Sequence, residues 1–379
     1  MQKKIIALAV AAAISGPAFA DNANITFYGV ADVSNDWVTT GNGTAAANGN
    51  TTVDGTTKRV ISSNTSKFGF KGAEDLGDGL HAIWQIEQQV DLDASTNSTA
   101  GKQVFATRNT FAGLKSESYG TVLMGIHDTP MKISTRRLDV FGDNIADNRS
   151  MLGKAKVSFD SRIGDALAYI SPAFSGVTVA VATANLSETS TTGSTANASA
   201  LSAAAMYDVA PFYAAVAYES HNLTSTAQVA PTAARPDPSE SAMRAGLGFK
   251  GDGYELNAMY ESTTDNQGTL NVKKYGHIAY YVGGKLKVTS NGTVKVAYTS
   301  MGTLGDTGEN DNSSATQVTV GYDHAMSKRT TLYALYSRIS NGTGSNYGFK
   351  DASTAGGTNS VNGYGGTPTA ISLGMKHSF

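Results

Sequence analysis

Charged side chains of both signs are concentrated in one long segment, residues 128–156. Opposite charges that face each other across water create a transverse field, which orients dipolar solutes and discriminates between ions. The segment also carries apolar side chains, which favour packing against a wall, although a fully solvated loop remains the alternative. The charged set is Asp128, Lys132, Arg136, Arg137, Asp139, Asp143, Asp147 and Arg149. The apolar set is Leu138, Val140, Phe141, Ile145, Met151 and Leu152.

The motifs of common enzyme classes are missing from the chain. None of the 6 histidines lies in an HExxH pattern, and there is neither a GxSxG elbow nor a Walker phosphate loop. With 0 cysteines, a thiolate nucleophile, a thiolate metal site and a disulfide framework are all excluded. A net charge of −2, with acids and bases mixed, leaves no basic stripe for nucleic acid. We therefore expect no enzyme, cofactor or metal site, although residues from different strands could still converge on one.

The first residues predict export. Lys3 and Lys4 form a positive start, 5–14 form a short apolar run, and 18–20 have the small-x-small spacing of a cleavage site. The apolar run is too short to span a bilayer as a helix. Residues 1–20 therefore read as a cleaved signal peptide.

The rest of the chain, 21–379, shows short segments that alternate with period two. Within 25–33 the odd positions are apolar or glycine, and Phe68 and Phe70 alternate with Lys67 and Lys71. This pattern predicts strands with one apolar and one polar face.

The connections between these segments alternate in length. Short turns on one end and long polar loops on the other are typical of an up-and-down barrel. The count predicts about sixteen strands, a barrel wide enough to enclose water. The tight connections are 74–79, 115–120, 171–176, 210–212, 251–253, 290–292 and 325–329. The long ones are about 35–57, 91–102, 128–155, 187–199, 224–241, 264–273, 303–313 and 341–367.

A transmembrane, all-β, antiparallel barrel therefore fits the pattern better than the soluble alternatives. A propeller should show a repeat of about 40 residues with a shared motif, and none is present. A sandwich would need more Leu, Ile and Val on its inward faces. The last strand ends in Phe379 behind alternating apolar residues, which looks like the signal that the outer-membrane assembly machinery recognises.

Several segments resemble a known family, the Gram-negative general porins and especially their betaproteobacterial branch. Ile25–Ala31 resembles the opening strand, and Ser66–Leu80 (SKFGFKGAEDLGDGL) resembles the second strand with its periplasmic turn. Arg108–Lys115 (RNTFAGLK) and Tyr169–Gly176 (YISPAFSG) resemble later elements. The resemblance runs from Ile25 to Phe379, and the SKFGFKGAEDLGDGL stretch is the most specific part of it.

The resemblance implies a homotrimer of sixteen-stranded barrels in the outer membrane, each with an inward-folded third loop at 128–156. It also implies contacts with outer-membrane lipid and lipopolysaccharide. Lys67, Arg108 and Arg162 resemble the family's pore-lining cations, and they would face loop charges across a constriction. Leu123 and Ile126 depart from the family, because related porins often carry basic residues there. The predicted constriction set is Lys67, Arg108, Arg162, Asp139, Asp143, Asp147, Arg136 and Arg137.

The expected function is a passive, water-filled channel for small hydrophilic solutes and ions, with weak ion selectivity that we expect to favour anions. A substrate-specific channel for a sugar or an anion is the main alternative. A structural or adhesive barrel and an outer-membrane hydrolase are the others. An aromatic track on polar strand faces would favour the sugar channel, and none is clear in the sequence.

Overall fold

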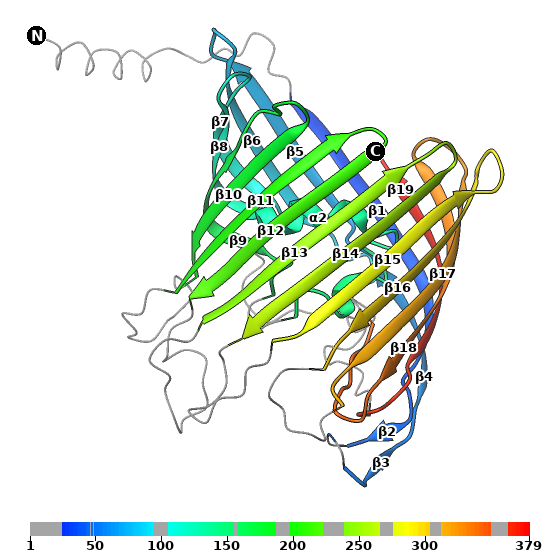
Figure 1. Ribbon diagram of the computed structural model, residues 1–379. Helices are drawn as coiled ribbons and strands as arrows, with labels where there is room; N and C mark the ends of the chain where they lie inside the picture. Colours follow the sequence, from blue (N-terminus) through cyan, green and yellow to red (C-terminus); the bar gives the residue numbers. More distant parts are fainter. Residues whose placement is uncertain are drawn as a thin grey trace, which may run out of the picture.

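The computed structural model describes residues 25–45, 47, 49–93, 105–154, 158–186, 198–222, 239–265, 276–303, 312–349 and 363–379. The predicted signal peptide lies outside the described residues. The described chain is almost entirely β-strand (Figure 1). The strands are β1 (Thr26–Thr39), β2 (Gly43–Thr44), β3 (Thr52–Val53), β4 (Thr57–Ser63), β5 (Lys67–Asp75), β6 (Leu80–Gln89), β7 (Thr110–Ser116), β8 (Gly120–Asp128), β9 (Arg162–Ile170), β10 (Val177–Asn185), β11 (Ser199–Val209), β12 (Phe212–Asn222), β13 (Ser239–Lys250), β14 (Tyr254–Asp265), β15 (Ile278–Lys287), β16 (Gly292–Met301), β17 (Ala315–Ala325), β18 (Thr330–Asn341) and β19 (Thr369–Ser378).

The main sheet closes on itself. Each strand pairs antiparallel with its neighbour, and β19 pairs with β1 from Val30↔Ser378 to Thr39↔Thr369. β4 and β5 both pair with β1, one after the other, so they are two halves of one interrupted strand and the closed barrel has 16 strands. β2 and β3 form a separate hairpin. The predicted fold class and strand number are confirmed.

The interruption between β4 and β5 is a bulge that decides which way a functional side chain points. The register changes from Val33↔Ser63 to Val30↔Lys67, which inserts one extra residue into the second strand. Ser66 secures the bulge, because its hydroxyl donates to the Asp32 carbonyl and accepts from the Asp32 N–H. An extra residue shifts the period-two alternation by one position. Ser62 and Lys67 therefore both face the lumen.

The apolar face of the strands points outward. Val216, Met243 and Leu247 have exposed fractions of 59%, 63% and 62%, while their inward neighbours Ala215 and Ala242 are buried. A soluble protein rarely exposes so continuous an apolar surface, whereas a barrel wall in lipid requires it.

The C-terminal residue closes the sheet. Phe379 exchanges both backbone hydrogen bonds with Gly29, at 3.0 Å each. Its ring lies 5.6 Å from that of Phe27 and directly over Gly29, where a Cβ would come within 2.3 Å of the ring. The predicted role of Phe379 in assembly stays a prediction.

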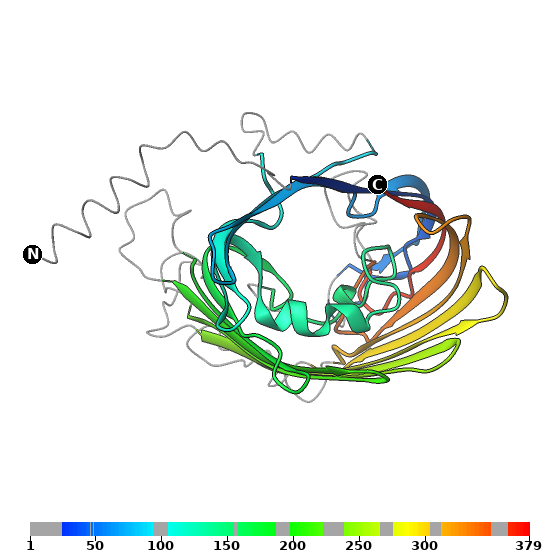
Figure 2. The same cartoon turned by 90° about the horizontal axis from the view of Figure 1, so that it is seen from above.

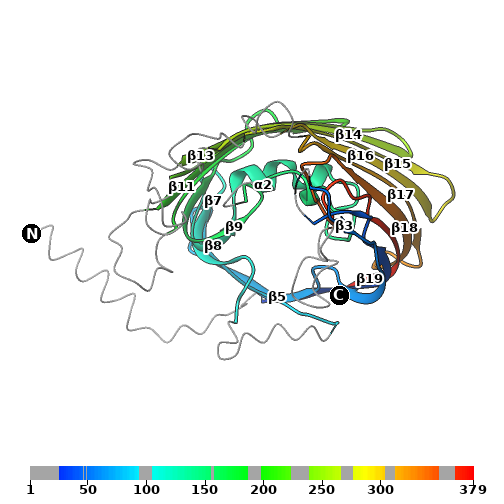
Figure 3. The same ribbon diagram turned by 90° about the horizontal axis from the view of Figure 1, so that it is seen from below.

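The helices of the described chain follow β8. They are α2 (Pro130–Thr135) and the short 3-10 turns η1 (Arg136–Leu138) and η2 (Asn148–Ser150). Viewed along the barrel, this segment lies inside the ring of strands (Figure 2). Seen from the other end, α2 runs along the side formed by β11 to β14, with β5 across the ring (Figure 3). No helix among the described residues is both long and apolar enough to cross a membrane.

Candidate functional site

The segment inside the barrel, which we call the inner segment (residues 129–154 and 158–161), begins as a capped helix. The Thr129 hydroxyl accepts from the Lys132 N–H at 3.3 Å, and Pro130 occupies the first turn, where no donor is needed. Both ends of the segment are tied together, since the Thr129 N–H donates to the Ser161 carbonyl. The segment therefore leaves and rejoins the wall at one place, between β8 and β9.

Polar anchors hold the inner segment to the far wall. The Tyr213 hydroxyl donates to the Ser134 carbonyl, and the Tyr281 hydroxyl accepts from the Val140 N–H at 2.8 Å. Farther along, the Ser150 hydroxyl donates to Gln317. These partners lie on β12, β15 and β17, so the attachment covers a wide part of the wall.

Apolar contacts accompany the polar anchors. Leu138, Met151 and Leu152 pack against wall residues such as Tyr213 and Ile339. A second group from the same segment packs against the wall near the barrel seam, and it consists of Val140, Phe141, Ile145 and Ala146 with Val38, Leu335 and Ala370. The core of this protein therefore lies between the inner segment and the wall.

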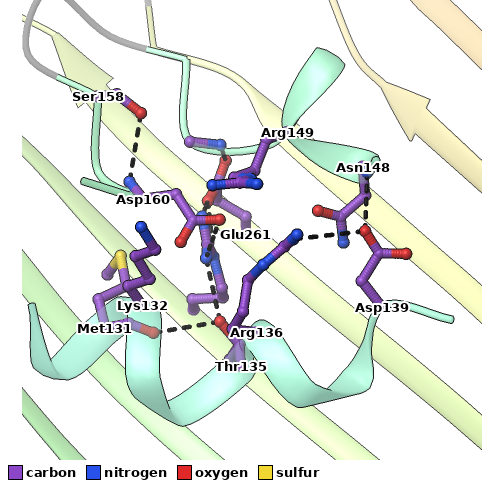
Figure 4. A network of polar contacts seen from close by, with 12 residues as sticks. Met131, Lys132, Thr135, Arg136, Asp139, Asn148, Arg149, Ser158, Asp160 and Glu261 are labelled. Atoms are coloured by element: carbon purple, nitrogen blue, oxygen red, sulfur yellow. Dashed lines mark hydrogen bonds and ion pairs between the residues drawn. The ribbon is translucent and has the colours of Figure 1, made fainter. Parts of the chain in front are cut away.

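The side of the inner segment that faces the lumen carries a cluster of ion pairs, and Figure 4 shows the one between Arg136 and Asp139. Asp147 is fully buried and accepts from the guanidinium groups of both Arg136 and Arg149. Both arginines also reach Asp143 Oδ1, at 2.9 and 3.0 Å. Asp139 lies 3.5 Å from Arg136 and accepts from two backbone N–H groups of the segment.

These contacts shift the pKa values of the three carboxyl groups in different directions. Burial disfavours the charge of Asp143, but Arg136 and Arg149 outweigh burial and bring its pKa down to about 2. The pKa of Asp147 is also lowered, because the same two guanidiniums outweigh its burial. Burial and the nearby Asp147 charge raise the pKa of Asp139 to about 6.

The opposite wall carries its own cations. Glu87 on β6 is buried and accepts from Arg108 Nε at 2.6 Å. Lys67 Nζ lies 3.5 Å from the same carboxylate, and the Tyr28 hydroxyl donates to it at 3.0 Å. One carboxylate therefore positions two cations.

A second acid lies where the inner segment leaves the wall. Asp128 Oδ1 is 3.0 Å from Arg162 Nη2 and 3.1 Å from Lys132 Nζ. Arg162 Nε also donates to Asn109 Oδ1 at 2.7 Å. Asp128 thus joins a wall cation to a cation of the inner segment.

The two sets of charges face one cavity of about 360 Å³. We call it the passage. Among the residues that the structure describes, six basic and four acidic side chains line it, so this described lining is net positive. The basic residues are Lys67, Arg108, Lys132, Arg136, Arg149 and Arg162, and the acidic ones are Asp91, Asp93, Asp128 and Asp143.

Comparison with known proteins identifies the family. The family model described as Gram-negative porin matches residues 7–345. The chain belongs to the Gram-negative porins. It is 27% identical to the outer membrane porin protein 32 of Delftia acidovorans, with 100% of both chains covered. It is 35% identical to the major outer membrane protein P.IB of Neisseria meningitidis over 48% of this chain, and that match spans only 49% of the relative.

Solved structures show the same porin fold. The anion-selective porin from Comamonas acidovorans matches with a TM-score of 0.73 at 21% identity, covering 94% of this chain and 100% of that one. The trimer form of OmpT from Vibrio cholerae matches with a TM-score of 0.67 at 12% identity, covering 95% and 100%. The outer-membrane relatives and the barrel place this porin in the outer membrane of a Gram-negative bacterium.

The structure brings together most of the porin residues singled out from the sequence. Lys67, Arg108 and Arg162 line the passage from the wall, and Arg136 and Asp143 line it from the inner segment. Asp139 and Asp147 lie behind that surface, buried under the arginines.

Arg137 lies outside the passage. Its guanidinium stacks 4.2 Å from the Tyr213 ring centroid and pairs with Asp208, and both members of that ion pair are more than half exposed.

Sequence reasoning did not single out Glu87, although its signal was present. Glu87 shares the inward face of β6 with Gln85 and Gln89, and an acid there must meet the neighbouring strands' cations. Leu123 packs in an apolar group with Ala168 and Ala182, so this part of the wall adds no charge to the lumen. Within the described residues, no group of three or more His, Asp or Glu side chains could hold a metal ion.

Proposed function

We propose that this porin is a passive, water-filled channel through which small hydrophilic solutes and ions diffuse across the outer membrane. The passage between the inner segment and the β5–β9 wall carries the proposal, because charged side chains line it from both sides. A barrel of this width holds water unless a segment fills it, and here the inner segment covers only one side of the ring (Figure 3).

Weak anion preference is part of the proposal. The lining is net positive, and its cations lie on both sides of the path. Cations in a low-dielectric constriction raise the local concentration of anions. The anion-selective Comamonas porin, which shares the fold, agrees with this sign.

We propose a homotrimer in the membrane, with lipopolysaccharide and lipid around its outward apolar face. Support for the trimer comes from the trimeric form of the Vibrio protein with the same fold. We further propose that a signal peptide at 1–20 is removed, that the outer-membrane assembly machinery recognises Phe379, and that the protein is no enzyme.

Single-channel recording of the purified protein in a planar bilayer tests the function. We expect large ohmic steps, closing in groups of three, and a reversal potential of the anion-preferring sign across a salt gradient. Folded protein that does not conduct would overturn the diffusion pore.

An anion-specific channel is the second candidate, because six cations line one passage. Saturation of the current at rising anion concentration would favour it, whereas a linear dependence favours the diffusion pore.

A further inference from the structure

A buried ion pair on the inner wall lies beneath the inner segment. Arg244 on β13 donates from Nε to Glu261 Oε2 on β14 at 2.8 Å, and the two residues are 3% and 0% exposed. The pair faces the lumen but lies outside the passage lining. Charges this deeply buried persist only with several hydrogen-bonding partners, and the inner segment supplies partners to both members of this pair.

The outgoing leg of the inner segment, residues 129–138, is held by Arg244. Its Nη1 donates to the Thr135 hydroxyl at 3.0 Å, and that hydroxyl in turn donates to the Met131 carbonyl (Figure 4). The guanidinium therefore fixes the last turn of α2, immediately before Arg136.

The return leg, residues 148–154 and 158–161, is held by the same pair. The Gly153 N–H donates to Glu261 Oε1 at 2.8 Å, and Asp160 lies 3.6 Å from Arg244. Gly153 has a φ of +71°, and a Cβ there would come within 3.2 Å of Arg244. Only glycine fits this close approach in the left-handed region without strain. On the wall side, His277 Nε2 lies 3.4 Å from Glu261 Oε1.

The other polar anchors, Tyr213, Tyr281 and Gln317, each contact one stretch of the segment. Tyr213 reaches α2, Tyr281 reaches the turn after η1, and Gln317 reaches η2 and the residues before it. The Arg244–Glu261 pair instead contacts both legs, one through each partner.

We propose that Arg244 and Glu261 form a clasp that sets the width of the passage by fixing both legs of the inner segment to the wall. The proposal rests on the diffusion-pore function. The two side chains are positioning residues: they touch no solute, and they act through the placement of Arg136 and Arg149.

The test is single-channel recording of Glu261→Gln in the full chain. An amide cannot neutralise Arg244, so the substitution breaks the ion pair to which both legs are bonded. We expect the conductance to rise about twofold, with greater open-channel noise and a weaker anion preference as the segment cations move away from the wall cations.

Glu255→Gln is the matched control. Glu255 lies on the same face of β14 and pairs with Lys285 at 3.1 Å, but the polar contacts of this pair are to wall residues. We expect wild-type conductance, noise and reversal potential from it. A folded Glu261→Gln barrel that behaves like wild type in all three would overturn the clasp.

A labelling experiment tests the clasp independently of ion conduction. The chain has 0 cysteines, so Ala146→Cys, which replaces a buried residue of the inner segment, introduces one thiol. We expect a hydrophilic maleimide to label it slowly in this background and about tenfold faster once Glu261→Gln is added. Equal labelling rates would overturn the clasp, and absent wild-type conduction would overturn only the diffusion pore.

Discussion

The two sides of the barrel interior use charge differently. On the β5–β9 wall, Lys67, Arg108 and Arg162 remain partly exposed and face the passage. On the β12–β17 wall, which the inner segment covers, Arg244 and Glu261 are fully buried and paired. Both sides follow the same period-two alternation. What a polar side chain does therefore depends on whether the inner segment or water lies in front of it.

The largest expected effect is on the covered side. Asp147→Asn leaves the partly buried guanidiniums of Arg136 and Arg149 with too little negative charge, which should destabilise the inner segment by about 3 kcal/mol. Hydrogen exchange should show it as lost protection of the Asp143 amide, which donates to Asp147. The strands should keep their protection, because this network includes none of them. Unchanged exchange in the segment would contradict the structural role of Asp147.

Asp139 should make the stability of the inner segment depend on pH. Its pKa is raised to about 6 in the folded segment from an ordinary value of 3.8. A raised carboxyl pKa means that protonation stabilises the fold: the stabilisation is complete below pH 3.8 and is lost as the pH rises through 6. Amide hydrogen exchange, corrected for its intrinsic pH dependence, gives the free energy of local opening of the inner segment. We expect this free energy to fall by about 1–2 kcal/mol between these two pH values.

Asp139→Asn is the comparison for that profile. The amide does not titrate, and its single carbonyl oxygen can still accept from one of the two N–H groups, of Phe141 and Asn148, that bond the two oxygens of Asp139. The profile should become flat in this variant. Asp143, whose pKa is lowered to about 2, contributes stability that is lost only as the pH falls toward that value. A profile that persists in Asp139→Asn would assign the titration to another group.

Substitutions on the open side, the β5–β9 wall, should change ion selectivity and not the stability of the inner segment. Replacing Arg108 and Arg162 together by glutamine should lower the anion-to-cation permeability ratio by a factor of roughly two to five. Reversal potentials across a salt gradient measure it. Arg137→Gln is the matched control, since that arginine lies outside the passage. Equal shifts in the two variants would mean that the charge of the whole lumen, not the passage, sets selectivity.

The smallest effect is expected at the exposed pair of Arg137 and Asp208. Asp208→Asn should change the free energy of unfolding by less than about 1 kcal/mol, because exposed ion pairs are weak. Denaturant titration of the barrel measures it. A larger loss would show that this pair, like the buried ones, anchors the inner segment.

The sequence predicted the barrel well because its signals are local. Alternation with period two and turn residues at regular intervals depend on near neighbours, and all seven predicted tight turns join consecutive strands. The sequence also marked the inner segment, since Leu138 and Phe141 are too apolar for a solvated loop.

The site was less predictable, because its geometry depends on long-range contacts. Arg136 and Arg137 are adjacent in sequence, yet one lines the passage and the other stacks on Tyr213. Glu87 gained its role from Lys67 on β5 and from Arg108, which precedes β7.

The sequence by itself thus determined that the chain forms sixteen alternating strands with an atypical long segment. The tertiary structure alone decided which charges face water, for two physical reasons. A one-residue bulge at 64–66 sets the direction of Lys67. The docking of the inner segment buries one half of the inner wall, including Arg244 and Glu261, and leaves the other half open.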